Sequence, residues 1–198
     1  MRLKKLQQVN FTAVYNDRIN HSVIKTDDIA RSLGANDNEQ KTVFEAPGVK
    51  VIILPQLKKE VVLEANRVVL NDNSGSDIGE SSLPEDFYKL SDKLPGSVGA
   101  YGFNYTIIIE SSEAIDFSDF LSDHLKQVFG DIIGSGVTIK YGSGSTEYTM
   151  QLAPAGIKTE MIVSLNVNYA SREIPPSEDL SAELTKNYEE LTKKVGAL

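Results

Sequence analysis

The feature that most restricts how this chain can fold is a β-strand pattern that occurs twice. Residues 102–110, GFNYTIIIE, alternate an apolar face with a mostly polar one, and residues 8–16, QVNFTAVYN, do the same 94 residues earlier. Aligning the two segments places Asn10 on Asn104, opposite the larger apolar side chains, and the even offset keeps the same face inward. The sequence therefore predicts two related strands, each with one buried face.

Similar elements follow each of these strands. The first half reads as a strand, a helix, hairpin strands and a closing helix, over residues 8–16, 26–34, 42–55, 60–72 and 82–94. The second half reads in the same order, over residues 102–110, 116–130, 137–152, 159–171 and 177–195. Glycines stop the first helix of each half at Gly34 and Gly130. We therefore expect an internal duplication of a β-α-β-β-β(-β)-α unit, with repeats at 1–96 and 97–198.

Hairpins about Pro47-Gly48 and about residues 142–145 favour antiparallel pairing of the strands. Such a unit has one apolar sheet face for its helices to cover, so the predicted fold class is α+β with helices on one face. No long linker separates the repeats, and we expect them to join in one continuous sheet as a single domain. The alternative is two similar domains side by side, hinged at residues 95–99.

The element order and the unit of roughly 90 residues resemble the TATA-binding-protein-like saddle fold, in which two such units form a curved antiparallel sheet backed by helices. That family binds the DNA minor groove with basic residues and intercalating Phe pairs. Here no Phe pair stands at matching strand ends, and the second half of the chain is acidic. The resemblance therefore implies the architecture, and its DNA-binding role is not carried over.

Composition narrows the class of protein. The hydrophobic fraction of 40% and the charged fraction of 24% are typical of globular chains, and the absence of cysteine excludes disulfides, thiolate nucleophiles and cysteine-bound zinc. No apolar run is long enough for a signal sequence or a membrane span, so we expect a soluble, cytoplasmic protein.

The net charge of −8 is concentrated in the second half of the chain. Residues 1–98 carry 13 basic and 14 acidic side chains, whereas residues 99–198 carry 7 and 14. An acidic surface repels phosphate backbones and anionic lipid headgroups. We therefore expect no nucleic-acid and no membrane partner.

Four groups of residues are candidates for binding chemistry, and each also has a structural explanation. The polar loop over residues 71–82 holds Asp72, Asp77 and Glu80, which are potential ligands of a divalent cation, but it departs from the EF-hand spacing and has the composition of an ordinary exposed loop. The Gly-Ser runs at 134–136 and 142–145 lack a phosphate-loop motif and are interpreted as turns.

The remaining candidates are two histidines and a lysine cluster. His124 lies within a predicted apolar helical stripe, where a structural imidazole is the usual explanation, and His21 lies in a polar loop. Residues 57–60, LKKE, with Lys50 nearby, read as a solvated hairpin tip or an edge guard. None of these candidates is paired by spacing with the partners that catalysis needs.

The sequence thus assigns no catalytic residue, no cofactor-binding residue, no metal ligand and no cofactor. Whether the protein is an enzyme stays open, and the balance of motifs is against it. We expect a binding or assembly module that presents a sheet face or edge to a protein partner or to a second copy of the chain. The alternative is a small-molecule-binding protein or enzyme, with a pocket between sheet and helices lined by Tyr101, Tyr105 and Phe120.

Overall fold

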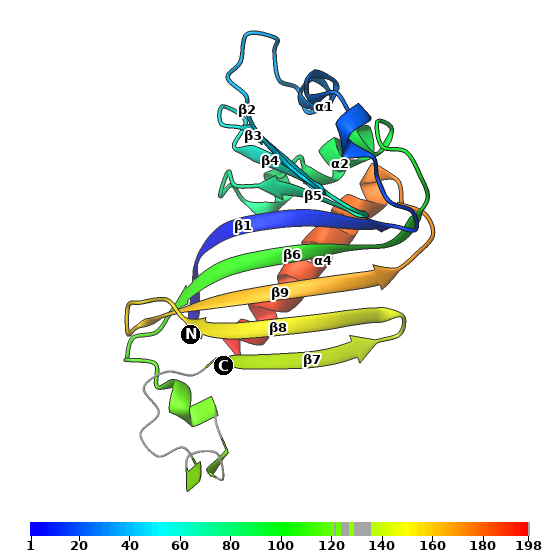
Figure 1. Cartoon of the computed structure of the whole chain (residues 1–198). Helices are drawn as coiled ribbons and strands as arrows, with labels where there is room; N and C mark the ends of the chain where they lie inside the picture. The colour runs from blue at the N-terminus through cyan, green and yellow to red at the C-terminus, as the bar shows by residue number, and fades with distance from the viewer. Residues whose placement is uncertain (121, 124–126, 129–135, 198) are drawn as a thin grey trace.

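The chain folds as an α+β protein with a single nine-stranded antiparallel sheet (Figure 1). The computed structural model describes residues 1–120, 122–123, 127–128 and 136–197. The strands are β1 (Arg2–Tyr15), β2 (Thr42–Ala46), β3 (Val49–Leu54), β4 (Lys59–Glu64), β5 (Arg67–Asp72), β6 (Val98–Glu110), β7 (Val137–Ser143), β8 (Thr146–Pro154) and β9 (Glu160–Ala170). The α-helices of the described residues are α1 (Thr26–Ser32), α2 (Leu83–Ser91) and α4 (Ser177–Gly196). Short 3-10 helices cover His21–Val23, Ile78–Glu80 and Phe117–Phe120.

The two strands with the repeated pattern are neighbours at the centre of the sheet. The strand order is β2-β3-β4-β5-β1-β6-β9-β8-β7, and every pairing is antiparallel. In the pairing of β1 with β6, Asn10 lies opposite Asn104 and Phe11 lies opposite Phe103. The antiparallel sheet that the sequence predicts is confirmed.

One face of the sheet carries the hydrophobic core. The apolar residues of β1 and β6 that alternate with polar ones are at most 3% exposed: Val9, Phe11, Ala13, Tyr15, Phe103, Tyr105, Ile107 and Ile109. The same face of β9 buries Met161, Val163, Leu165 and Val167. Helix α2 contacts β1 and β5, α4 contacts β1 and β6, and α1 contacts β3. All three helices cover this face, and we call the opposite face the open face.

Helix α4 shows how the local sequence fixes the covering layer. Pro176 precedes its first residue, Glu178 and Asp179 lie in its first turn, and two lysines lie in its last turn, which matches the helix dipole. A stripe at helical spacing is buried against the sheet: Leu180, Leu184, Leu191 and Val195. This is the apolar face that the sequence predicts.

Ser82 and Glu85 have the spacing of a capping box, with Pro84 in the first turn, but the start of α2 differs from that pattern. Ser82 Oγ bonds to the side chain of Asp86 at 2.6 Å instead of capping a backbone N–H, and Glu85 pairs with Lys89. Asp86 lies one helical turn beyond Ser82, on the buried side of the helix, and its carboxylate accepts a charge-assisted hydrogen bond from the Ser82 hydroxyl. Of the helix expected over 116–130, the structure describes residues 116–120, 122–123 and 127–128, and it begins with the 3-10 helix Phe117–Phe120. His124 lies outside the described residues. Among the described residues, no helix is long and apolar enough to cross a membrane.

Candidate binding surface

The open face of the sheet carries a row of asparagines that crosses its central strands. Asn71 of β5 lies opposite Asn10 of β1, Asn10 lies opposite Asn104 of β6, and Asn104 lies opposite Asn166 of β9. Four adjacent strands therefore present an amide group at the same level. We call these four residues the amide row.

Hydrogen bonds join the side chains of the amide row. Asn104 Nδ2 donates to Asn10 Oδ1 at 2.7 Å, and Asn166 Nδ2 donates to Asn104 Oδ1 at 2.5 Å. At the other end, Asn71 Nδ2 donates to Glu60 Oε1 at 2.8 Å and Asn71 Oδ1 accepts from Gln8 Nε2 at 3.2 Å. Since an amide has two donor hydrogens and two acceptor lone pairs, Asn10, Asn104 and Asn166 keep hydrogen-bonding capacity for a ligand. Asn71 is only 7% exposed and closes the row at β5.

A hollow of about 270 Å³ lies over the amide row on the side of β8. Its lining side chains on the open face are uncharged and carry amide or hydroxyl groups: Asn10, Asn104, Thr106, Thr149, Gln151, Ser164 and Asn166. Thr106 Oγ1 and Ser164 Oγ lie 3.5 Å apart across β6 and β9. The hollow can therefore both donate and accept hydrogen bonds, but it offers no charge to an ionic ligand.

The other half of the open face carries an apolar row, with Glu60 and Glu64 of β4 on either side of it. Phe44 of β2, Val51 of β3, Val62 of β4 and Val69 of β5 lie opposite one another in a second cross-strand row. The three valines are partly exposed and Phe44 is 60% exposed. We call this row the apolar row. Val69, the last residue of the row, lies opposite Thr12 of β1. The apolar and the polar regions of the open face therefore meet at the centre of the sheet.

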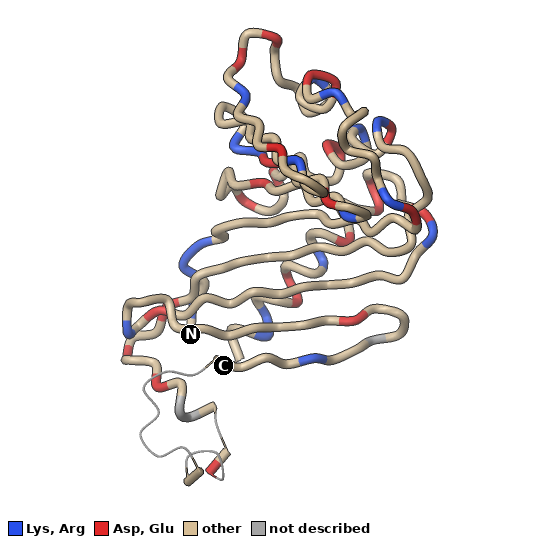
Figure 2. The backbone as a smooth tube through the Cα atoms, in the orientation of Figure 1, with Lys and Arg blue, Asp and Glu red and all other residues tan. Residues whose placement is uncertain are grey.

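Charged residues are sparse on the central strands. Figure 2 shows long uncharged stretches along β1, β6 and β9, with charged residues gathered at strand ends, loops and helices. At the end of the open face, Arg2 pairs with Glu110 at 2.5 Å, and Lys4 pairs with Glu160. These ion pairs neutralise the charges that border the surface. Nothing in this arrangement is typical of a phosphate-binding surface.

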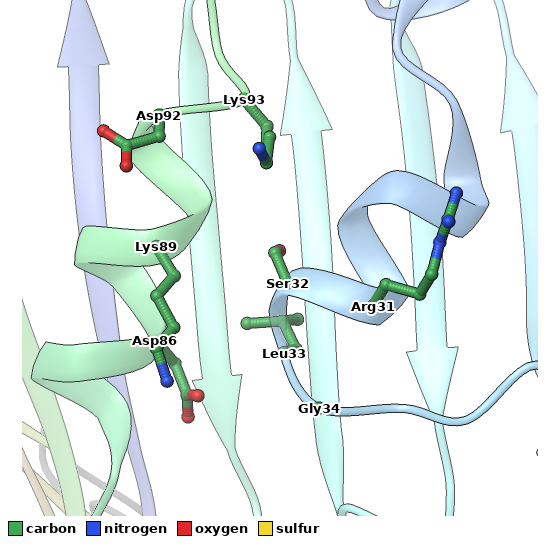
Figure 3. Close-up of a pocket in the computed structure, with 8 residues that line it drawn as sticks. All are labelled: Arg31, Ser32, Leu33, Gly34, Asp86, Lys89, Asp92 and Lys93. Carbon is green, nitrogen blue, oxygen red and sulfur yellow. The ribbon is translucent and has the colours of Figure 1, made fainter.

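A second hollow, of about 420 Å³, lies between α1 and α2 (Figure 3). It is lined by Arg31, Ser32, Leu33, Gly34, Asp86, Lys89, Asp92 and Lys93. Most of its charged side chains form ion pairs with residues that do not line the hollow. Arg31 pairs with Asp28 on its own helix, and the Asp92 carboxyl points away from α1. Because both helices bring their C-terminal ends here, no free backbone N–H groups converge on this hollow to bind an anion.

The polar loop that follows β5 is closed by its own hydrogen bonds. Asp72 Oδ1 accepts from the backbone N–H of Ser74 at 2.9 Å, and Oδ2 accepts from Ser81 Oγ at 2.7 Å. Across the described residues, no three His, Cys, Asp or Glu side chains, Asp77 and Glu80 included, group as metal ligands. Asp72 thus has a structural role in this loop.

The structure gives the other candidates different surroundings. His21 lies in the first 3-10 helix, where its Nε2 is shielded and has no hydrogen-bond partner. No carboxylate of the described residues is bonded to that imidazole, as acid–base catalysis would require. The predicted hairpin about residues 142–145 joins β7 to β8 through a turn at Gly144 and Ser145.

The predicted solvated lysine tip holds for Lys58, which is exposed in the turn between β3 and β4, but not for Lys59 and Lys50. Lys59 Nζ lies 2.6 Å from Asp86 Oδ2, and both side chains are largely buried. Lys50 is also buried, and its Nζ donates to the backbone carbonyl of Ile24 at 2.9 Å. Both lysines point to the helix-covered face, where they anchor α2 and the segment before α1.

The aromatic residues proposed to line a pocket contact α4 instead of an open space. Tyr101 OH bonds to the carboxylate of Glu183 at 3.1 Å, and Tyr105 OH donates to the backbone carbonyl of Leu184 at 2.8 Å. Burial raises the pKa of both tyrosines, and the Glu183 carboxylate adds to the rise for Tyr101. Phe120 packs at the margin of the core beside Phe117. Tyr101 and Tyr105 therefore hold the last helix on the sheet.

The polar part of the open face follows from the repeated pattern, because Asn10 and Asn104 fall on the same face of related strands. The apolar row was missed. Its signal is present in segments 49–54, 60–64 and 67–72, whose apolar residues occupy both faces of each strand. Such continuous apolar runs indicate burial on both sides, whereas here only one side is covered.

The chain matches no family model, and no curated protein is significantly similar to it.

Proposed function

We propose that this protein is a non-enzymatic binding module that holds a protein partner on the open face of its sheet. The observation that supports this is the joint presence, on an uncovered face, of the amide row and the apolar row. The four amide side chains lie in register with one another, and the apolar row adds exposed aromatic and aliphatic surface.

The chemistry of the two rows favours a protein ligand. An apolar patch that adjoins hydrogen-bonding groups is the usual composition of an interface that binds another protein. Asn side chains can pair with the N–H and C=O groups of a polypeptide backbone. The sparse charge on the central strands disfavours ligands whose binding depends on ion pairing, such as nucleic acids.

The proposal is tested with two single substitutions on the open face. Asn166→Lys places a charge in the amide row, and Val62→Lys places one in the apolar row. The immobilised full chain is expected to capture a stoichiometric partner from native extract, and both variants are expected to lose it. Ala182→Lys, on the exposed side of α4, adds the same charge outside the face and should leave capture unchanged.

The result that contradicts the proposal is equally direct. If Asn166→Lys and Val62→Lys remain folded by circular dichroism and still capture the same partner at the wild-type level, the open face is not the binding surface. If no partner is captured and the chain binds a small molecule instead, the alternative function replaces this one.

We also propose that the chain is an internal duplication with a saddle architecture like that of the TATA-binding-protein-like fold. The sheet order is compatible with this, since β5, β4, β3 and β2 extend from the centre on one side and β9, β8 and β7 on the other. The repeated residues Asn10 and Asn104 face each other at the centre, where a pseudo-two-fold axis would pass. An experimental structure in which no rotation superposes 1–96 on 97–198 would contradict the duplication.

A further inference from the structure

The edge strand β2 presents an unpaired edge with exposed apolar side chains. It is one end of the nine-stranded sheet, and among the described residues only β3 pairs with it. Val43 and Phe44 are 44% and 60% exposed, and they lie on opposite faces of the strand. Phe44 is also the outermost member of the apolar row. The edge is therefore both open to hydrogen bonding and flanked by apolar surface.

The turn between β2 and β3 determines which backbone groups are free. Ala46 and Val49 are paired on either side of the two-residue turn Pro47-Gly48. The pair that closes such a turn is hydrogen bonded, and bonded pairs then alternate along an antiparallel ladder. Every second residue from Ala46, namely Phe44 and Thr42, therefore bonds to β3.

The intervening residues, Val43 and Glu45, direct their N–H and C=O groups to the free edge. By the same alternation, Lys41, which immediately precedes β2, also directs its N–H and C=O groups to the free edge. Unpaired edges of this kind are templates for strand addition, and proteins usually guard them with lysine or proline. β2 itself contains neither residue.

The opposite edge of the sheet is guarded. β7 carries Lys140 on the open face in the middle of the strand, so an added strand there would have to cover a charge. The only charged residue within β2 is Glu45, which is exposed and lies on the helix-covered side, 3.8 Å from Lys50 Nζ. The two edges thus differ in how well they accept another strand.

The β2 edge is complementary to itself. When two β2 strands run antiparallel about Val43, the valine lies opposite its counterpart in the second copy. Lys41, whose Nζ also pairs with Asp27 at 2.9 Å, then lies opposite Glu45 of the second copy, and Glu45 lies opposite Lys41 of the second copy. Oppositely charged residues opposite one another stabilise antiparallel pairs. This register uses the free backbone groups of all three residues and brings the two apolar rows together.

We propose that two copies of this chain form a dimer by antiparallel pairing of their β2 strands about Val43. The dimer joins two nine-stranded sheets into one continuous sheet. Its interface is isologous, as in most homodimers, because the same residues meet across a two-fold axis. This inference does not depend on the open-face function, since it rests on the edge and not on the face.

Sedimentation equilibrium of the full chain tests the proposal over protein concentrations from about 1 µM to about 1 mM, because dimer formation depends on protomer concentration. The wild type is expected to approach twice the monomer mass of 21.7 kDa. Val43→Pro removes a free N–H without touching the β2–β3 bonds, and it should weaken association at least tenfold, to about a tenth of the wild-type affinity. Thr138→Pro, at the equivalent free-edge position of β7, should leave association unchanged.

Charge reversal tests the register. Lys41→Glu and Glu45→Lys should each weaken the dimer, and the double variant K41E/E45K should recover it. A wild type that stays monomeric throughout the range, or a folded Val43→Pro variant that associates like the wild type, overturns the dimer. Single reversals that weaken association without recovery in the double variant overturn the register about Val43.

Discussion

Asn10 and Asn104 lie opposite each other on the two central strands, and the amide of Asn104 donates to the side-chain oxygen of Asn10 at 2.7 Å. Asn104 also accepts a hydrogen bond from Asn166. One side chain therefore connects three strands of the open face. Replacing Asn104 should therefore change both the stability of the fold and the affinity for any ligand of this surface.

We expect Asn104→Asp to lower the free energy of unfolding by about 1–2 kcal/mol at pH 7, because a carboxylate would face the Asn10 oxygen without a donor. The loss should shrink below about pH 4, where an aspartic acid is protonated and can donate. Urea denaturation at both pH values measures it. The control is Asn168→Asp, on the same face and exposed, and an equal loss in both variants would contradict the role of the Asn10–Asn104 bond.

Gly102 on β6 permits the close approach of β9. A Cβ atom at this position would lie 2.2 Å from the backbone oxygen of Val167, so the strands would have to separate. We expect Gly102→Ala to destabilise the protein by about 1–3 kcal/mol, as overpacking usually does. Gly79→Ala, where nothing lies within 4 Å of the added atom, is the control and should change stability little. Thermal unfolding of the two variants and the wild type measures these differences in stability, and equal stability of the two variants would contradict the prediction.

Alkaline pH should destabilise the fold through its buried tyrosines. Burial raises the pKa of Tyr15 to about 12, from an ordinary value of 10.0. Between these two values the unfolded chain loses the Tyr15 proton while the folded chain keeps it, so stability is complete below pH 10 and is lost as the pH rises through 12. For Tyr15 alone the loss between pH 8 and pH 11 should be about 1 kcal/mol.

The measurement is urea denaturation at pH 8, 10 and 11 for the wild type and for Tyr15→Phe. The phenylalanine variant should lose less stability over this range, since it has no proton to release. Burial also raises the pKa of Tyr101 and Tyr105, so part of the alkaline loss should persist in the variant. A wild type whose stability is the same at pH 8 and pH 11 would refute the prediction.

Removal of only one partner of the Lys59–Asp86 ion pair should strongly lower the stability of the protein. Lys59 Nζ lies 2.6 Å from Asp86 Oδ2, and the two side chains are 13% and 7% exposed. Asp86→Ala leaves a buried ammonium without its partner, and we expect a loss of about 3–5 kcal/mol. The double variant Lys59→Met/Asp86→Leu should recover most of the stability, because both charges are removed together.

A double-mutant cycle of chemical denaturation measures this coupling. Arg67 and Glu64, an exposed ion pair at 2.6 Å, provide the comparison, and their coupling should be below about 1 kcal/mol. Equal coupling in the two pairs would show that burial is not what makes the Lys59–Asp86 pair matter.

Much of the fold could be predicted because its strands have a covered face. The alternation of Phe103, Tyr105 and Ile107 with polar residues sets a period of two, and only one face of such a strand can enter the core. The hairpin at Pro47-Gly48 follows from local turn chemistry in the same way. The capping-box spacing of Ser82 and Glu85 is not used in the fold, where the Ser82 hydroxyl donates to Asp86 and Asp86 pairs with Lys59.

The sequence by itself determined the strands, the antiparallel hairpins and the amphipathic helices, since periodicity and turn residues act over short stretches of chain. Tertiary structure alone decided that Asn10 meets Asn104, that Lys50 is buried and Lys59 pairs with Asp86, and that β2 ends the sheet with Phe44 exposed. These facts depend on the register and order of strands that are distant in the sequence. Pairing between such strands is set by how the whole core packs, and no local pattern contains that information.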